Sequence, residues 1–411
     1  MIVRKLDFYI RAVAKFVCFG SLKALAYVWP RNSESVVMGG WSGELFIDNP
    51  KYLLLYMLEH TDFKITWIGN DGLRRQLPQN EKLGFARKGS FAAFVKLINA
   101  KTWICCQAVS MDLTEFPILG RAQSIDLWHG IPIKYVGELT PSLRSAKVKS
   151  SLCRKIYQAV VTNSHSWLVV SNDKMIDILC DGAPSRYVRS KILRVGTPRN
   201  DFLLNNASNK WAISSLRQKY STLLGFDKRK KIVLYLPTWR MNGDVFAFYK
   251  LSNQEQSVWH RALDDANAVL IEKHHRETYK NYPTAKSSHC SIVISSEMQK
   301  EIDVQELLLV ADVLISDYSG AYIDFGLLKK PVVHFAYDLD TYKSSDSGLA
   351  YDLQDVAAGP IVTNYEELLH LATETLRKLK CQQGSNYLSL VQYENGEASK
   401  AICDFMMTTR R

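Results

Sequence analysis

ADVLISDYSGAYIDF, residues 311–325, is the stretch that decides the fold of this chain. The run DVLIS has the apolar character of a buried strand, and AYIDFGLL is expected to form a helix after the turn at Ser319 and Gly320. Such a strand–turn–helix junction presents free backbone N–H groups and the positive end of a helix dipole to an anion. The stretch therefore indicates an α/β sheet with a phosphate-binding turn.

Strands and helices alternate along the rest of the chain. The first half has strand-like runs at 35–41, 63–69, 102–108 and 124–130, and helical segments at 49–60, 90–100 and 174–182. The second half restarts at KIVLYLPTW and continues with AVLIEKHH, SIVISS, DVLISD, PVVHFAY and IVTN. Because strands that alternate with helices pair in parallel through right-handed crossovers, we expect an α/β protein with two facing Rossmann-like domains and a cleft between them.

Composition limits the possible partners. A chain of 411 residues exceeds one ordinary core, which supports two domains. Its 52 Lys and Arg outnumber its 41 Asp and Glu, and the net charge of +11 favours an anionic partner such as a phosphate, a nucleotide or an acidic lipid. The basic residues are spread out rather than gathered with stacking aromatics, so no nucleic-acid partner is expected. The eight cysteines form no CxxC pair, which indicates a reduced cytosolic protein without a disulfide framework or a metal site.

The N-terminal segment, residues 1–34, is basic and amphipathic. On a helix, Leu6, Ile10 and Val13 share one face and Arg4 lies opposite. Lysines interrupt the apolar run before it reaches the roughly 20 residues that span a bilayer, and no signal-peptide cleavage site follows it. We expect a helix that lies in the membrane interface against anionic lipid, so that the protein is peripheral at the cytoplasmic face. The alternative is a helix packed on the chain's own first domain.

The segment DLWHGIPIK, residues 126–134, holds the candidate base. His129 lies within WHGIP, where a helix is not expected, so its side chain should project from a loop that follows the strand SIDLW. An imidazole titrates near neutral pH and suits the removal of a proton from an attacking hydroxyl. The alternative is a loop histidine that only hydrogen-bonds a carbonyl.

Polar residues at the strand ends of the second half are the candidate diphosphate ligands. Ser316, Asp317, Ser319 and Gly320 form the expected phosphate turn, in which Asp317 either caps the following helix or binds a ribose. Arg240 follows KIVLYLPTW and is expected to point its guanidinium into the cleft, where the charge matches a diphosphate. A surface salt bridge is the alternative for Arg240.

Signatures of other phosphate chemistries are missing from the sequence. The chain has no Walker-type glycine-rich loop, and no D-x-D pair ends an early strand as a sugar-nucleotide metal site requires. We therefore expect catalysis by protein cations, N–H groups and a histidine, with no cofactor and no obligatory metal. His334 lies inside the strand PVVHFAY and is expected in the core rather than in catalysis.

These motifs, taken in order, resemble the CDP-glycerol glycerophosphotransferase family, which includes teichoic-acid primases and polymerases and related capsule polymerases. The likeness rests on WHGIP, GTPRND, PTWR, the histidine after VLIEK and the segment from DVQELLL to DLDTY, and it covers roughly residues 35–406. It implies a two-domain fold of the glycosyltransferase-B type. The polar stretch NNASNKWAISSLRQKYSTLLGFDKRKK, residues 205–231, is expected to carry the boundary between an acceptor domain at 35–220 and a CDP-donor domain at 221–411 that includes closing C-terminal helices.

The resemblance also implies an activity. A polyol phosphate, glycerol phosphate before ribitol phosphate, is transferred from a CDP-linked donor to a hydroxyl of a lipid-linked glycan or a growing polymer, and CMP is released. The reaction is expected to be a step in the synthesis of a cell-surface polysaccharide. Whether the chain acts as a primase or a polymerase stays open, as do its oligomeric state and the identity of the acceptor.

Two positions depart from the family's pattern. The family has a His-Pro pair where this chain reads EKHHR at 272–276, and we prefer His274 as the donor to the β-phosphate or to the leaving CMP, with His275 as the alternative. The family commonly has a second serine where Gly320 stands, and the glycine keeps the backbone N–H while it permits a closer approach. The alternative activities are a glycosyltransferase of the same architecture that uses a nucleotide sugar and, more remotely, a non-catalytic module that binds anions or lipid.

Overall fold

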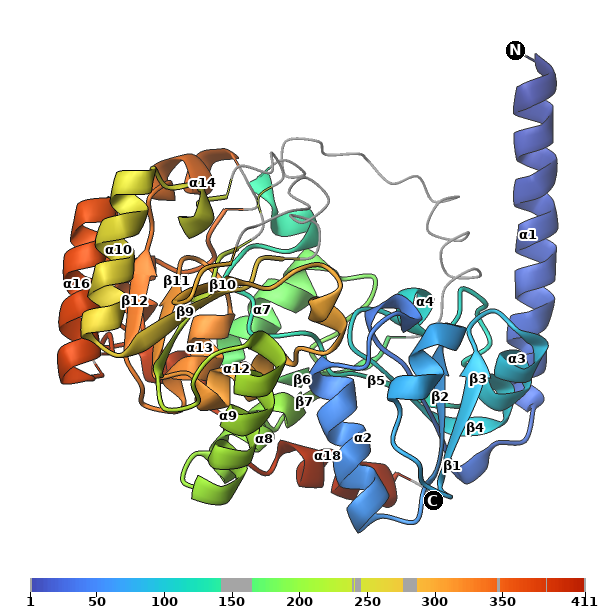
Figure 1. Cartoon of the computed structure of the whole chain (residues 1–411). Coiled ribbons are helices and arrows are strands. Elements are labelled where there is room, and N and C mark those ends of the chain that lie inside the picture. Colours follow the sequence, from blue (N-terminus) through green and yellow to red (C-terminus); the bar gives the residue numbers. More distant parts are fainter. Residues whose placement is uncertain are drawn as a thin grey trace.

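The computed structural model describes residues 2–141, 165–238, 240, 245–275, 287–345, 348–381 and 383–409. In this part of the chain two parallel sheets lie side by side, with helices packed around them (Figure 1). Hydrophobic clusters cover both faces of each sheet, because neighbouring residues of one strand, such as Val233 and Leu234, belong to different clusters. The α/β class with two Rossmann-like sheets is thus confirmed.

The first sheet has the strand order β3-β2-β1-β4-β5-β6-β7. Its strands are β1 (Asn32–Met38), β2 (Lys64–Gly69), β3 (Leu83–Arg87), β4 (Ala100–Cys105), β5 (Gln123–Asp126), β6 (Trp167–Val170) and β7 (Ile192–Arg194). The second sheet has the order β10-β9-β8-β11-β12-β13. Its strands are β8 (Lys231–Leu236), β9 (Ala268–Glu272), β10 (Ser291–Val293), β11 (Val313–Ser316), β12 (Val332–Phe335) and β13 (Ile361–Val362).

Counted from its own first strand, each sheet begins with the Rossmann order 3-2-1-4-5-6. The order reverses between β1 and β4 in the first sheet and between β8 and β11 in the second, where Met38 pairs with Ile104 and Leu236 with Ser316. Open parallel sheets bind ligands outside the carboxyl ends of the strands at such a reversal.

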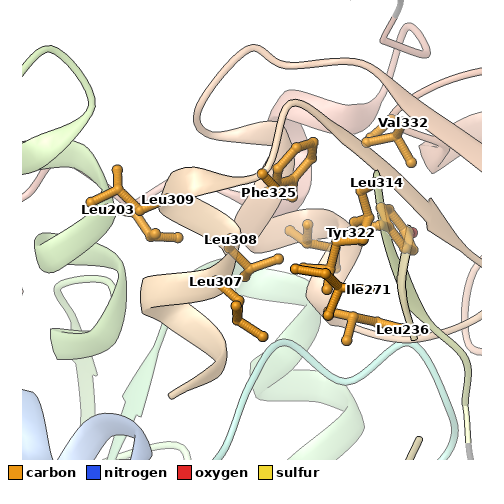
Figure 2. Close-up of a cluster of buried hydrophobic side chains, with 14 of the residues drawn as sticks. Leu203, Leu236, Ile271, Leu307, Leu308, Leu309, Leu314, Tyr322, Phe325 and Val332 are labelled. Carbon is orange, nitrogen blue, oxygen red and sulfur yellow. The ribbon is translucent and has the colours of Figure 1, made fainter. Parts of the chain in front are cut away.

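The connecting helices are α2 (Asp48–His60), α3 (Phe91–Asn99), α4 (Val109–Asp112), α7 (Asp173–Gly182), α8 (Pro198–Asn206), α9 (Lys210–Leu224), α10 (Asn253–Asp265), α12 (Val304–Val310), α13 (Ala321–Gly326), α14 (Leu339–Ser345), α15 (Leu353–Val356), α16 (Tyr365–Lys378), α17 (Tyr387–Leu390) and α18 (Ala398–Thr408). Figure 2 shows how α8, α12 and α13 bury leucines and aromatics together with strands of the second sheet.

Some boundaries differ from the sequence-based expectation. The strands expected at 35–41 and 124–130 end earlier, at Met38 and Asp126, because the following residues turn toward the candidate site. The edge strand β3 was not expected, since LGFAR buries only its alanine. The helix α9 occupies much of the polar stretch 205–231, in which the domain boundary is expected, and only a few of its side chains, such as Tyr220 and Leu224, are buried.

The C-terminal helix α18 returns to the first sheet. Its residues Ile402, Cys403 and Met406 belong to the same hydrophobic cluster as Val36 of β1. The helix therefore ties the end of the chain to the first sheet, although it follows the second sheet in sequence. The division into domains at residues 220 and 221 stays a prediction.

The N-terminal helix α1 (Ile2–Val28) stands away from the rest of the molecule in Figure 1. Among the side chains that the structure describes, Leu22 and Ala26 pack in a cluster with β1 and β4, whereas Val13 and Val17 are 62% and 61% exposed. The alternative of a helix packed on the first domain therefore describes the last turns of α1 but not the exposed residues 13–18. Among the described residues, no helix combines the length and apolar character needed to cross a membrane.

Candidate functional site

The candidate site lies where both sheets have their strand-order reversals. His129 follows β5 in the first sheet, and the turn at Ser319 follows β11 in the second. The loop after His129 crosses to the other domain, since Ile131 and Ile133 belong to the hydrophobic cluster of the second sheet. A Cβ atom added at Gly320 would lie 3.2 Å from the carbonyl oxygen of Ile131, closer than ordinary van der Waals contact, so the two motifs pack together and leave little room for a side chain at Gly320.

His129 is held in a defined orientation. Its Nδ1 lies 3.0 Å from the carbonyl oxygen of Cys106, at the end of β4, so Nδ1 carries the proton and donates this bond. The lone pair is then on Nε2, which is the atom of a neutral imidazole that can accept a proton. The ring stacks on Trp128 with centroids 4.4 Å apart, and His129 remains partly exposed.

The carbonyl that holds His129 is itself fixed by a buried carboxylate. Asp112 accepts hydrogen bonds from the backbone N–H groups of Cys106 and Gln107 at 2.9 and 2.8 Å. Its other oxygen accepts the N–H of Ser42 at 2.9 Å, so the ends of β1 and β4 are joined through one side chain. Three donors on one buried acidic group stabilise the turns on either side of the strand-order reversal.

Unusual backbone conformations gather around the same histidine. Trp41, Ser42, Asp48 and Trp128 have positive φ angles of 49°, 57°, 64° and 54°. Each such non-glycine residue costs on the order of 1–3 kcal/mol, and such residues persist where the surroundings over-determine them, typically at functional sites. The indole of Trp41 approaches the ring of His129 edge-on, with centroids 6.0 Å apart.

Arg199 joins the histidine loop to both domains. Its buried guanidinium contacts Asp48 of α2 at 3.0 Å and Asp324 of α13 at 2.7 Å, and it donates to the carbonyl oxygen of His129 at 3.2 Å. Burial lowers the pKa of Arg199, but the Asp324 and Asp48 carboxylates outweigh that effect and raise it above its ordinary value. Gly130 has φ +123°, and an added Cβ would lie 2.7 Å from this guanidinium, so a glycine is required.

In the phosphate turn, Ser319 and Gly320 are partly exposed, whereas Ser316 and Asp317 are buried. Ser316 donates from its hydroxyl to the carbonyl oxygen of Leu236 at 2.9 Å and thereby joins β11 to β8. The carboxylate of Asp317 accepts the N–H of Thr238 at 2.9 Å and its hydroxyl at 2.6 Å. These contacts fix the turn to the carboxyl end of β8.

Asp317 does not cap the following helix. The N-cap residue of α13 is Gly320, with no side-chain cap bond, because the carboxylate of Asp317 points back to β8 instead. His334 supports the same residue: its Nδ1 donates to the carbonyl oxygen of Asp317 at 3.2 Å, while its Nε2 accepts the N–H of Ala358 at 3.1 Å. Burial lowers the pKa of His334 to about 4, so this core histidine is neutral at physiological pH.

Arg240 has a different environment from the one expected. Its side chain is only 3% exposed, and it pairs with Asp317 at 2.9 Å and with Asp338 at 2.8 Å. The rings of Tyr318 and Tyr342 lie 5.2 and 4.6 Å from its guanidinium carbon. The Arg240 guanidinium is therefore neither open to the cleft nor part of a surface salt bridge. Two carboxylates that follow other strands already neutralise its positive charge. Arg240 stands behind the phosphate turn.

The two histidines after β9 differ in exposure. His274 is 2% exposed, and its Nε2 lies 2.5 Å from the carboxylate of Glu272. Burial raises the pKa of Glu272, and the bond to His274 opposes that rise. His275 is exposed. In this conformation His275 is therefore the more accessible of the two to a ligand.

Several residues of the site were not found by sequence reasoning. Trp41, Ser42, Asp48 and Asp112 received no role, and Arg199 was left without a task. The sequence did contain one signal for these residues. The glycine turn after the first strand lies at the strand-order reversal between β1 and β4, where open parallel sheets bind ligands. Their contacts with the histidine loop join segments far apart in the sequence, which a linear pattern does not reveal.

A family model described as CDP-glycerol:poly(glycerophosphate) glycerophosphotransferase matches residues 21–408. The chain is 28% identical over 379 residues to a teichoic acid glycerol-phosphate transferase of Staphylococcus aureus, which covers 90% of this chain and 92% of the relative. It is 23% identical over 391 residues to a teichoic acid poly(glycerol phosphate) polymerase of Bacillus spizizenii, covering 92% of this chain and 93% of the relative.

Among solved structures, the wall teichoic acid polymerase TagF superposes with a TM-score of 0.71 at 21% identity, over 99% of this chain and 98% of that chain. This likeness supports the glycosyltransferase-B type of fold expected from the sequence.

Proposed function

This chain belongs to the CDP-glycerol:poly(glycerophosphate) glycerophosphotransferase family, and on that premise we propose how its residues carry the reaction. The chain is a transferase that moves a polyol phosphate from a CDP-activated donor to a polymer acceptor in cell-wall polymer synthesis. The observation that carries the residue assignment is the contact between the His129 loop and the phosphate turn at Gly320.

His129 acts as the general base in this proposal. The oxygen of the acceptor hydroxyl attacks the phosphorus of the polyol phosphate, and Nε2 of His129 takes the hydroxyl proton. A new P–O bond to the acceptor forms, the bridging P–O bond of the diphosphate breaks, and CMP leaves with that electron pair. The bond from Nδ1 to Cys106 supports this role, because it leaves the Nε2 lone pair available.

The donor diphosphate lies at the turn after β11. The hydroxyl of Ser319 and the backbone N–H groups that follow it contact the phosphate oxygens, and His275 or a rearranged His274 contacts the leaving CMP. Ser316, Asp317 and Arg240 hold the turn in position; the bond from Ser316 to Leu236 and the ion pair between Arg240 and Asp317 support this role. No step in this proposal passes through a metal or a cofactor.

The acceptor is a lipid-linked glycan or a growing polymer, and the chain meets it at a membrane surface through α1. The exposed Val13 and Val17 on a helix that stands away from the molecule support this proposal. The basic, amphipathic composition of residues 1–34 favours anionic lipid at the interface. We place the protein peripherally at the cytoplasmic face on this basis.

The deciding experiment is mass spectrometry of the products formed with a lipid-linked acceptor and either CDP-glycerol, CDP-ribitol or a UDP-sugar. We expect an acceptor that is heavier by one or more polyol phosphates, together with free CMP. The glycerol and ribitol donors are distinguished by which one is consumed. Transfer of a sugar from the UDP donor without CMP release would instead identify a glycosyltransferase.

A further inference from the structure

A carboxylate, an imidazole and a thiol come together beside the edge strand β10 of the second sheet. They lie at the amino end of this strand, at the end of the sheet opposite to the phosphate turn. Asp264 lies in the last turn of α10, and His289 and Cys290 immediately precede β10. Nε2 of His289 is 2.9 Å from Oδ2 of Asp264. One ligand atom of each residue lies within 4.8 Å of the other two.

A second histidine lies beside this cluster. His260 is one helical turn before Asp264, so both project from the same face of α10. Its ring centroid is 5.9 Å from that of His289, and its Nε2 lies 3.2 Å from the hydroxyl of Ser288. His260 is therefore the nearest further imidazole that the described residues offer beside the group.

The ligand chemistry points to one class of ion. An imidazole, a carboxylate and a thiol together match the donor set of Zn²⁺, whereas calcium and magnesium take oxygen ligands. A thiolate at Cys290 and the carboxylate of Asp264 would balance the two positive charges of the ion. Lys230 lies 3.7 Å from Oδ1 of Asp264 and leaves Oδ2 facing His289.

We propose that Asp264, His289 and Cys290, with His260 as an additional ligand, bind a Zn²⁺ ion that ties the end of α10 to the start of β10. The cluster lies at the amino end of β10, whereas the phosphate turn follows the carboxyl end of β11 in the same parallel sheet. The site is therefore structural and lies apart from the transfer chemistry.

Titration of the metal-free protein with Co²⁺ tests this proposal, because a thiolate–cobalt bond gives a charge-transfer absorption band. We expect one equivalent of Co²⁺ to produce the band and Zn²⁺ to displace it. Cys290→Ser should abolish the band, and His289→Ala should weaken binding by more than about tenfold. Since His289 is exposed, its variant is expected to fold even if the buried Cys290 variant does not.

Cys381→Ser is the matched control, since Cys381 is partly exposed and outside the cluster. It should leave the cobalt spectrum unchanged. Zn²⁺ should also raise the unfolding temperature of the wild type and of Cys381→Ser, but not that of His289→Ala. The proposal is wrong if the wild type gives no cobalt band, or if His289→Ala gives a band of the same intensity as the wild type. Asp264 and His289 would then form an ion pair only.

Discussion

At the scale of single residues, two kinds of polar group surround the candidate site. His129 is oriented by one bond to a carbonyl and keeps an accepting nitrogen for chemistry. Arg240 forms ion pairs with Asp317 and Asp338; Arg240 and Asp317 are buried, and Asp338 is partly exposed. We propose that His129 acts on a substrate and that the Arg240 group keeps the phosphate turn in shape.

Replacement of His129 by alanine removes the proposed base. Turnover of the CDP donor should fall by roughly 100- to 10,000-fold, the usual contribution of general acid–base catalysis. CDP affinity in a calorimetric titration should stay close to that of the wild type, because His129 belongs to the opposite domain. His165→Ala is the control for a partly exposed histidine outside the site. Near-normal turnover in His129→Ala would overturn the assignment.

Replacement of Arg240 by alanine should first destabilise the fold. Asp317 and Asp338 would lose their shared counter-charge, and breaking a buried ion pair costs about 3–5 kcal/mol. Urea unfolding measures this loss, with Arg229→Ala as the control, since Arg229 makes an exposed pair with Asp227. A variant that keeps its unfolding midpoint but loses CDP affinity would show that Arg240 contacts the donor directly.

At the scale of elements, the N-terminal helix is the part least supported by the rest of the molecule. Its anchor is local: Phe19 packs edge-on against Phe116 at 5.7 Å, and Arg31, just after the helix, donates to the carbonyl oxygens of Ile118 and Leu119. The side chains of residues 13–15 are exposed, and we propose that this part of the helix contacts a partner outside the first sheet.

Deletion of residues 1–15 should release the protein from anionic vesicles and leave its unfolding midpoint unchanged, because Phe19, Leu22 and Ala26, which anchor the helix, remain. Vesicle co-sedimentation measures binding, and added salt should weaken binding of the full chain, since each basic residue near an anionic surface contributes about 1 kcal/mol. Vesicles of neutral lipid are the control. Equal binding of the truncated and full chains would place the membrane contact elsewhere.

The segment before α18 contains a buried acidic group. Glu394 accepts hydrogen bonds from the hydroxyl of Ser171 at 2.5 Å and from the N–H of Thr197 at 3.1 Å. Burial raises the pKa of Glu394 to about 7, although these bonds act in the opposite direction. The folded protein therefore binds this proton more tightly than the unfolded chain does.

This raised pKa predicts the pH dependence of stability. Protonation of Glu394 favours the folded state fully below pH ~4.5, the ordinary pKa of a glutamate, and the advantage is lost as the pH rises toward about 7. Relative to Glu394→Gln, the wild type should lose up to about 1.4 kcal/mol of unfolding free energy per pH unit in that window. Urea titrations at several pH values measure the difference, and parallel curves for the two proteins would contradict it.

At the scale of the whole molecule, buried charges join the two domains. Arg199 connects Asp48 of the first domain to Asp324 of the second, and Lys51 on α2 pairs with Asp303 at the start of α12 at 2.6 Å. The Arg199 contacts lie directly behind the His129 loop. The relative placement of base and phosphate turn thus depends on this interface.

Arg199→Ala should cost about 3–5 kcal/mol of unfolding free energy, because it leaves two carboxylates buried and unpaired. Small-angle scattering should also show a larger radius of gyration if the domains separate. Arg189→Ala is the matched control, since its ion pairs with Asp177 and Asp181 are exposed and lie within the first domain. If both variants are equally stable, Arg199 does not hold the domains together.

The sequence by itself determined the α/β class, the two sheets, the loop position of His129 and the turn at Ser319. Each of these follows from a local pattern: a β-branched run, a glycine or proline that ends it, and a polar residue directly after the strand. The family resemblance rests on the same short segments. Such local patterns can be recognised in the sequence because residues that are neighbours along the chain produce them.

Only the tertiary structure decided which groups the polar residues meet. Arg240 lies beside Asp317, 77 residues away, so its guanidinium is paired inside the protein, and we propose that it supports the turn. Asp112 and Arg199 hold the His129 loop from distant segments, and α18 returns to the first sheet. The physical reason is that a buried charge takes its partner from whatever the fold brings near, and no spacing along the chain encodes that choice.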